Sequence, residues 1–385
     1  MRVKKRATLA AAATLAVSAI AAASVVASPL AEAQPGAGFL GGFSSITTVA
    51  PTVPANGDVN PYGVAVVPHS QGKLVKGDVL VSNFNDSANQ QGTGTTIVSV
   101  SPGKVSVFAH ISASGLPGGC PGGVGLTTAL SILNGGWVVV GSLPTNMGNP
   151  STSKAGCLLV LNSAGKVVET FSGHGINGPW DMTAVNFGPV AKLFVTNVLN
   201  GTVAAAVNAG VDTTMNAGPT VHKGTVLRLL VTTPPSGHGV PKLLDSDVIG
   251  SGFGEHTDPA ALVIGPTGVG LGRGGTLYVA DTVGNRITAI PDALFREHSA
   301  GTGRMVSTDK ALNGPLGLAI APNGDILAAN SGDGNLVEVT PGGVQVAHPM
   351  VTKGGAGALF GLAVAPRGSG VYFVDDSVNT LDLLH

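Results

Sequence analysis

The side chains best suited to acid–base or metal chemistry lie in two short segments, each just before a repeated apolar phrase. His174 lies in GHGING, Asp181 follows shortly after it, and Glu255 and His256 lie in GEHTDP. A histidine and a carboxylate together can polarise a carbonyl group or transfer a proton, with or without a metal ion. The sequence therefore offers His174, Asp181, Glu255 and His256 as candidates for a catalytic cluster. Solvated polar side chains on separate loops are the alternative interpretation.

Asparagine or aspartate ends a predicted strand in most of the repeating units. These residues are Asn83, Asn197, Asp281, Asn330 and Asp375. Such side chains hydrogen-bond to nearby backbone amides and shape turns, whereas a ring of their oxygens could bind Ca²⁺. Because the pattern recurs in nearly every unit, the turn-shaping role is favoured. No complete ligand set defines a cofactor site, and Ca²⁺ or Zn²⁺ remains open for the His–carboxylate candidates.

One short apolar phrase, which recurs six times, would position these residues. Each copy begins with a turn and continues as a run of small apolar residues, which is typical of a strand buried on both faces. Six such units, each with room for four strands, predict an all-β six-bladed β-propeller. The copies are NPYGVAVVP (60–68), CPGGVGLTTAL (120–130), GPWDMTAV (178–185), DPAALVIGP (258–266), GPLGLAIAP (314–322) and ALFGLAVAP (358–366).

The last unit ends at His385 after three predicted strands, whereas a strand-like segment, SSITTVA (44–50), precedes the first unit. We expect this segment to supply the missing outer strand and close the ring, because closure removes exposed sheet edges. A loose N-terminal tail is the alternative. The propeller domain is accordingly predicted to span 44–385.

The fifth unit, GPLGLAIAPNGDILAANSGDGNLVEVTPGG (314–343), resembles an NHL repeat, and TLYVADTVGNRITAI (276–290) matches the second half of the same pattern. The resemblance covers all six units, with looser matches in the second and third. It implies a six-bladed propeller with a central channel. Propellers of this family serve as binding platforms, lyases and hydrolases, so the resemblance bears on fold more than on function.

In the related lyases, histidines follow the turn prolines and bind zinc. Here those positions hold Tyr62, Gly122, Trp180, Ala260, Leu316 and Phe360. The zinc set is therefore missing, and of the acidic set of gluconolactonase-type propellers only Asp181 is suitably placed. The sequence instead predicts an aromatic channel mouth for an apolar or sugar-like ligand, or a plug of core side chains. The predicted ligand-binding residues are Tyr62, Trp180, Asp181, Leu316 and Phe360.

Residues 1–33 are predicted to be a secretory signal peptide, with basic residues at the start, an apolar stretch and an Ala31–Ala33 A-x-A cleavage site. A short segment, 34–43, then precedes the propeller. After cleavage no membrane anchor is expected, so the mature protein is predicted to be secreted or periplasmic. Because such compartments are oxidising, Cys120 and Cys157 are predicted to form a disulfide bond.

The whole chain has a formal net charge of −1 and no cluster of lysine and arginine, so nucleic acid is not an expected partner. The sequence favours an exported NHL-type propeller, monomeric, that binds a small molecule or a protein through its loop-rich face and channel mouth. A propeller enzyme, either a lyase or a lactone hydrolase dependent on Ca²⁺ or Zn²⁺, is the alternative.

Overall fold

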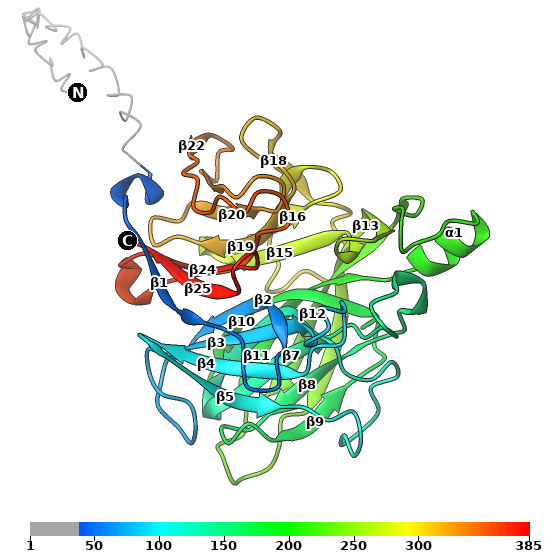
Figure 1. The fold of residues 1–385 in the computed structure, drawn as a ribbon, viewed down its shortest axis with the longest axis vertical. Helices are drawn as coiled ribbons and strands as arrows, with labels where there is room; N and C mark the ends of the chain where they lie inside the picture. Colours follow the sequence, from blue (N-terminus) through cyan, green and yellow to red (C-terminus); the bar gives the residue numbers. More distant parts are fainter. Residues whose placement is uncertain (1–37) are drawn as a thin grey trace, which may run out of the picture. The chain divides into compact units, whose positions relative to one another are not determined.

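The computed structural model describes residues 38–385. The predicted signal peptide, 1–33, lies outside the described residues. Within the described part, antiparallel sheets form six blades arranged in a ring, and α1 (Thr202–Asn208) is the single α-helix (Figure 1). The fold is therefore a six-bladed β-propeller, which confirms the fold predicted from the repeats. None of the helices between residues 38 and 385 has the length and apolar character needed to span a bilayer.

In the first three blades, consecutive strands pair in sequence order, and the first strand of each lies at the channel. Blade one consists of β2 (Val59–Val66), β3 (Val79–Asn85), β4 (Thr96–Ser101) and β5 (Lys104–His110). Blade two consists of β6 (Leu126–Leu133), β7 (Trp137–Ser142), β8 (Cys157–Leu161) and β9 (Val167–Phe171). Blade three consists of β10 (Gly178–Phe187), β11 (Val190–Val198), β12 (Val221–Thr232) and β13 (Leu243–Asp258), with the short β14 (Leu262–Ile264) added.

The last three blades repeat this order. Blade four consists of β15 (Pro266–Leu271), β16 (Leu277–Asp281), β17 (Arg286–Ile290) and β18 (Arg304–Thr308). Blade five consists of β19 (Pro315–Ile320), β20 (Ile326–Asn330), β21 (Leu336–Val339) and β22 (Gln345–Ala347). Blade six consists of β23 (Leu359–Val364), β24 (Val371–Asp375), β25 (Thr380–Leu384) and β1 (Ile46–Pro51). Short 3₁₀ turns are η1 (Leu40–Gly42), η2 (Asn134–Gly136), η3 (Pro150–Thr152), η4 (Arg273–Gly275) and η5 (Pro366–Gly368).

The ring closes as the sequence predicts. β1 pairs antiparallel with β25, from Ile46 opposite Leu384 to Pro51 opposite Thr380, and Figure 1 shows the two termini of the propeller side by side. The outer strand of blade six therefore comes from the start of the domain and the other three strands from its end. Closure gives blade six its fourth strand and pairs the edge that β25 would otherwise expose.

The segment before β1 is also fixed to the propeller, which the sequence does not predict. The fully buried carboxylate of Glu338 accepts hydrogen bonds from the backbone N–H groups of Phe39, at 2.6 Å, and Leu40, at 2.8 Å. Leu40 itself is 1% exposed and packs in the apolar cluster between blades five and six. Carboxylates bound to backbone amides make strong, charge-assisted hydrogen bonds, so Glu338 holds the chain in place as it enters β1.

The start of blade four differs from the sequence prediction. The phrase DPAALVIGP predicts its first strand, but β13 continues to Asp258 and β14 folds back on it, with Asp258 opposite Leu262. The innermost strand is β15, which begins at Pro266. The pattern misleads here because the following segment, GPTGVGL, is also small and apolar and starts with the same Gly-Pro turn. An apolar run alone does not show which of two adjacent segments lines the channel.

The apolar core is divided among the spaces between blades. Between blades one and two, for example, Leu80 and Ile97 pack with Val138 and Leu159, and all four are 0% exposed. Similar clusters lie at the other boundaries, and the one between blades six and one is continuous with the buried end of the channel. The first strands are thus held from outside, which leaves their inner faces free to line the channel.

Candidate functional site

The central channel is closed where the first strands begin and open where they end. In β19 and β23 the first four residues are buried and the last two are partly exposed, and β2, β10 and β15 also become more exposed toward their ends. A cavity of about 400 Å³ lies between the six first strands. Its wall reaches Pro68, Ile132, Ile320 and Val364, at or next to the strand ends. The cavity therefore opens on the face opposite the predicted mouth.

The predicted aromatic mouth is a buried plug. Tyr62, Trp180 and Phe360 are 1%, 3% and 4% exposed. The ring of Tyr62 lies 5.4 Å from that of Trp180 and 4.1 Å from that of Phe360, centroid to centroid. The indole N–H of Trp180 donates to the carbonyl oxygen of Val263 at 2.6 Å. These contacts support the plug that the sequence left open as the alternative, and they close that end of the channel.

Two of the positions assigned to the mouth from the sequence belong elsewhere. Leu126 pairs with Ser142 in blade two just as Pro61 pairs with Asn83 in blade one, so Thr127 rather than Gly122 corresponds to Tyr62. In blade four, Thr267 takes the place expected for Ala260, because the first strand begins at Pro266. Both threonines are buried. Of the predicted ligand-binding residues, Asp181 and Leu316 line the cavity.

Asp181 is the single titratable residue in the wall of this cavity, among residues 38–385. Its carboxylate accepts hydrogen bonds from the backbone N–H groups of Met182, at 2.8 Å, and Val269, at 3.2 Å. Burial raises the pKa of Asp181 to about 7, although these two hydrogen bonds act in the opposite direction. Near neutral pH the group can therefore hold a cation as a carboxylate or exchange a proton.

The rest of the wall is uncharged, and the hydroxyl groups of Thr128 and Ser131 are already engaged, whereas Thr183 adds a further hydroxyl group. Thr128 donates to the carbonyl oxygen of Trp180, and Ser131 donates to that of Met182 at 3.5 Å. The remaining lining residues are mostly aliphatic or glycine, including Val64, Leu318 and Leu362. The side chains of the wall are thus mostly aliphatic, with the carboxylate of Asp181 as the single group that can carry a charge among residues 38–385.

The other catalytic candidates do not join Asp181. His174 is exposed on the turn before β10, where its carbonyl oxygen accepts a hydrogen bond from Ser246. Glu255 and His256 lie near the end of β13. The carboxylate of Glu255 accepts a hydrogen bond from the backbone N–H of Asn200, in the loop after β11, at 2.8 Å. The Asp181 carboxylate bonds instead to Met182 and Val269. The expected convergence of these four side chains is not found.

Glu255 is fully buried, and one of its carboxylate oxygens has no hydrogen-bond partner within residues 38–385. Burial raises the pKa of Glu255 to about 7, opposed by hydrogen bonds from Asn200 and Leu199 and by the charge of Lys223. His256 lies 3.7 Å from the carboxylate of Asp258. Burial acts to raise the pKa of Asp258, but the nearby His256 and hydrogen bonds from the backbone N–H groups of Ala260 and Ala261 outweigh it and lower the pKa.

The residues that line the channel do not fit a Ca²⁺ or Zn²⁺ site. Among residues 38–385, no three His, Cys, Asp or Glu side chains are arranged to hold a metal ion. Zinc sites use three or four such ligands and calcium sites six to eight oxygens, whereas the channel provides one carboxylate, that of Asp181.

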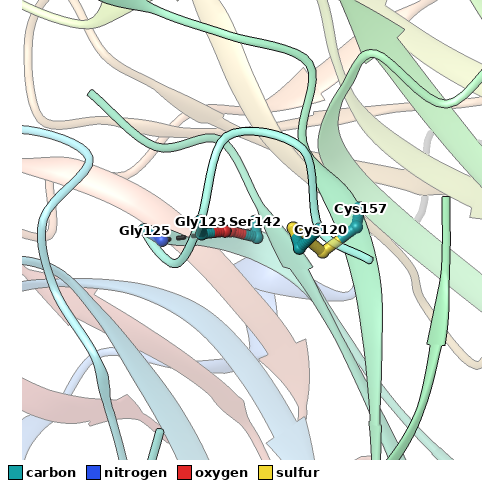
Figure 2. The surroundings of a disulfide bond; sticks show 5 residues. All are labelled: Cys120, Gly123, Gly125, Ser142 and Cys157. Carbon is teal, nitrogen blue, oxygen red and sulfur yellow. Dashed lines mark hydrogen bonds between the residues drawn. A yellow bond between two sulfur atoms is a disulfide. The ribbon is translucent and has the colours of Figure 1, made fainter. Parts of the chain in front are cut away.

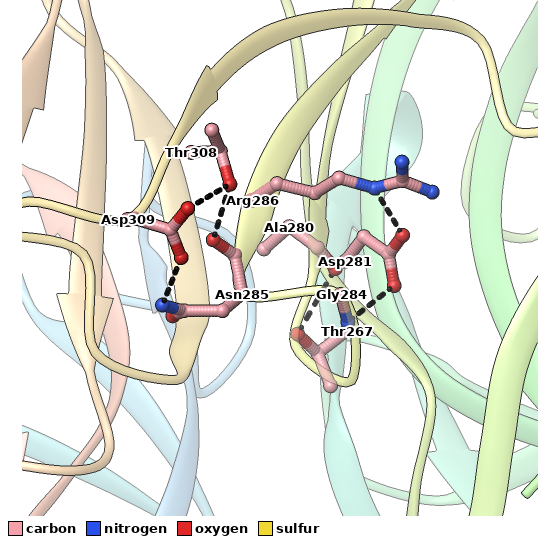
Figure 3. A network of polar contacts seen from close by, with 8 residues as sticks. All are labelled: Thr267, Ala280, Asp281, Gly284, Asn285, Arg286, Thr308 and Asp309. Carbon is pink, nitrogen blue, oxygen red and sulfur yellow. Dashed lines mark hydrogen bonds and ion pairs between the residues drawn. The ribbon is translucent and has the colours of Figure 1, made fainter.

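The Asx residues at the strand ends shape turns. In Figure 3, Asp281 accepts hydrogen bonds from the N–H of Gly284, at 3.2 Å, and from Arg286, at 2.8 Å. Asn285 donates to Asp309 at 3.3 Å and so joins β17 to the end of β18. The side-chain oxygens of Asn197 and Asp375 are likewise engaged, whereas Oδ1 of Asn83 and of Asn330 is buried without a hydrogen-bond partner among residues 38–385. Three of the five strand-end residues therefore support the turn-shaping interpretation over a ring of calcium ligands.

The predicted disulfide bond is confirmed: Cys120 and Cys157 are joined, with their Cα atoms 5.3 Å apart. It ties the loop before β6 to the start of β8 (Figure 2). Beside it, the hydroxyl of Ser142 donates to the carbonyl oxygen of Gly123 and accepts from the N–H of Gly125. The bond therefore lies on the closed side of the channel, away from the cavity opening.

Solved structures with the same fold include several enzymes. A gluconolactonase from Xanthomonas campestris aligns over 88% of both chains with 14% sequence identity and a TM-score of 0.51. An aldose sugar dehydrogenase from Streptomyces coelicolor, determined with bound PQQ, aligns over 88% of this chain and 97% of its own with 15% identity and a TM-score of 0.50. A luciferin-regenerating enzyme aligns over 88% and 94% of the respective chains with 11% identity and a TM-score of 0.51. At such identities the likeness shows the propeller fold alone.

No protein-family model matches the sequence, and no curated protein matches it. The resemblance to NHL repeats is therefore not confirmed beyond the propeller architecture.

Stability is expected to fall as the pH rises toward neutrality, because Glu255 must ionise in a buried position. Its pKa, raised by burial to about 7, lies above the value of about 4.3 for an unfolded chain. The resulting stabilisation is complete below about pH 4 and is lost as the pH rises to about 7, since the folded state binds this proton more tightly. Between about pH 5 and about pH 8, denaturant titrations should show the wild type losing roughly 2 kcal/mol more than Glu255→Gln.

The matched control is Glu297→Gln, because Glu297 is exposed. This variant should lose as much stability as the wild type over the same range. Equal losses in the wild type and Glu255→Gln would show that Glu255 ionises freely in the folded protein.

Proposed function

We propose that this protein is an exported, NHL-type binding propeller whose ligand is a small molecule held in the central channel. The ligand carries a basic nitrogen that pairs with Asp181 and an apolar body that fills the rest of the cavity. The observation that carries the proposal is the chemistry of the wall, in which one carboxylate lies among uncharged, mostly aliphatic residues. Small-molecule sites commonly combine an apolar cavity with few polar groups that fix orientation.

The geometry of Asp181 supports a cationic group as its partner. The two backbone N–H groups of Met182 and Val269 hold the carboxylate in place, and no lysine or arginine lines the cavity among the described residues. A bound ammonium group would supply the missing opposite charge, and an opposite charge lowers a carboxylate pKa. Ligand binding therefore favours the ionised form of Asp181.

Export is supported by the disulfide bond between Cys120 and Cys157, because such bonds persist in oxidising compartments. It is consistent with the signal sequence predicted for residues 1–33. Together they make the secreted or periplasmic location part of the same proposal.

A second function is favoured by one observation, the pKa of about 7 for Asp181. A carboxyl group that titrates near neutral pH is suited to general acid–base catalysis. In that case the protein is an enzyme, and the residues present support proton transfer by Asp181 without a Ca²⁺ or Zn²⁺ ion. The solved structures with the same fold named above include a gluconolactonase, so lactones are the first substrates to test.

Calorimetric titration with hexylamine tests the proposal. The wild type should bind the amine near pH 8, and affinity should fall about tenfold for each pH unit below 7, because protonated Asp181 no longer attracts a cation. Asp181→Asn should bind at least about tenfold more weakly at pH 8, since it lacks the charge. The control is Asp245→Asn, which changes an exposed carboxylate and should leave binding unchanged.

Equal affinity of the wild type and Asp181→Asn for the amine would contradict the binding proposal. If the wild type also hydrolyses a lactone and Asp181→Asn does not, the catalytic alternative holds instead.

A further inference from the structure

A second cavity, of about 290 Å³, adjoins the mouth of the channel. Pro68 and Ile132 belong to the walls of both cavities. The second cavity, which we call the side lobe, lies between the β2–β3 turn, the β6–β7 turn and the end of β10. A molecule bound in the channel would therefore emerge next to this lobe. Its lining residues are Pro68, His69, Gln71, Leu74, Ile132, Leu133, Asn134, Gly135, Gly136 and Asn186.

The lobe is polar but carries no acidic, lysine or arginine side chain among the described residues. Gln71, Asn134 and Asn186 provide three carboxamide groups, and His69 adds an imidazole. Leu74 is 1% exposed and provides an apolar floor, whereas Pro68 is exposed at the rim of the lobe. This composition differs from that of the channel, whose wall includes the carboxylate of Asp181.

Each carboxamide is fixed through one of its atoms. Gln71 donates through Nε2 to the carbonyl oxygen of Gly135 at 2.9 Å, which joins the turns of blades one and two. Asn134 donates through Nδ2 to the carbonyl oxygen of Gly188 at 3.2 Å. Oδ1 of Asn186 accepts the backbone N–H of Asn134 at 2.9 Å, which joins blades two and three.

The other atom of each carboxamide has no hydrogen-bond partner within residues 38–385. These atoms are Oε1 of Gln71, Oδ1 of Asn134 and Nδ2 of Asn186, that is, two acceptors and one donor. Groups that are held in place before binding lose little conformational freedom when a ligand arrives. Fixed donors and acceptors without charge match hydroxyl groups, which both donate and accept.

We propose that the channel and the side lobe form one two-part site for an amphiphilic glycoside with a basic nitrogen. The sugar hydroxyl groups bind to Gln71, Asn134 and Asn186 in the lobe. The apolar chain lies in the channel, and the nitrogen reaches Asp181. This inference rests on the proposed function for the Asp181 end and extends it to the class of ligand. A neutral polar group in the lobe avoids the cost of burying a charge that has no partner there.

Three probes test the two halves of the site separately: hexylamine, hexyl glucoside and aminohexyl glucoside, which joins the two groups. Calorimetry at about pH 8 should show aminohexyl glucoside binding to the wild type at least about tenfold more tightly than hexylamine, since two or more hydrogen bonds are gained. Gln71→Ala and Asn186→Ala, made separately and checked by thermal melting, should each lose most of this gain and leave hexylamine binding unchanged. Asp181→Asn should weaken the binding of both amines and leave the affinity for hexyl glucoside unchanged.

The matched control is Asn208→Ala, because Asn208 is exposed at the end of α1 and should not alter any affinity. The inference is overturned if aminohexyl glucoside binds the wild type no more tightly than hexylamine, or if the gain survives in both lobe variants. Failure of the proposed function gives a different result, because then both amines bind Asp181→Asn as tightly as they bind the wild type. In that case the sugar-binding role of the side lobe is still supported if hexyl glucoside binds the wild type and binds Gln71→Ala and Asn186→Ala more weakly.

Discussion

A chain that starts at Thr52, and so lacks β1, is expected to lose most of its stability. The deletion removes the whole ladder between β1 and β25 and leaves β25 as an exposed edge. It also removes Ala50, which is 3% exposed in the core, and the backbone groups bound by Glu338. We expect a loss on the order of 5 kcal/mol, comparable with the total stability of many domains. Denaturant titration measures it, and light scattering should show association through the open edge.

Two further chains separate the contributions. A chain that starts at Gly38 keeps every described contact and serves as the reference. A chain that starts at Ser44 keeps β1 but lacks the hydrogen bonds of Phe39 and Leu40 to Glu338, so its stability should lie between those of the other two. If the chain from Thr52 unfolds at the same denaturant concentration as the reference, β1 does not hold the ring closed.

The architecture could be predicted from the sequence because each blade repeats one local pattern. Phrases such as GPLGLAIAP and ALFGLAVAP mark strands that must be buried on both sides, and their number equals the number of blades. Ring closure could also be predicted from the sequence, because the last unit has only three predicted strands and one further strand-like segment precedes the first unit. The exception at blade four arose where two apolar segments, LVI and PTGVGL, compete for the same position. Only the long-range pairing of β15 with β16 decides between them.

The site was less accessible to sequence reasoning, because it depends on contacts between distant blades. Asp181 was recognised as a candidate, but its partner Val269 lies 88 residues away. The face on which the channel opens follows from the packing of Tyr62 against Trp180 and Phe360, and an aromatic at a strand start is equally compatible with a mouth or a plug. His174 and Glu255 were assigned to one candidate cluster because both precede apolar phrases, yet His174 is exposed and Glu255 is fully buried.

The side lobe had no sequence signal at all. Gln71, Asn134 and Asn186 lie in turns, where polar residues are usual, and they meet because blades one, two and three are neighbours in the ring. Glu338 likewise stands within an ordinary strand, β21. Its role became visible only when the chain before β1 was found against it. Residues of this kind are identified by the structure, since neither their type nor their spacing is unusual.

Removal of the disulfide bond should produce the second large effect. The bond closes a loop between residues separated by 37 positions, and the loss of this cross-link should lower the free energy of unfolding by about 4 kcal/mol in the chain-entropy description. The Cys120→Ala/Cys157→Ala variant should therefore unfold at clearly lower denaturant concentration than the wild type. The effect should be confined to stability, because the bond lies on the closed side of the channel and Asp181 lies on the open side. Amine binding at about pH 8 should thus be unchanged in the folded variant.

A reducing agent provides the matched control for the same bond. It should destabilise the wild type by a similar amount and leave the double alanine variant unaffected, because that variant has no thiol to change. The hydrogen bonds of Ser142 to Gly123 and Gly125 remain in both cases, so any loss reports the covalent link rather than the loop contacts. An unchanged unfolding midpoint, together with two reactive thiols in the untreated protein, would show that the bond does not form, and the support it gives to export would be removed with it.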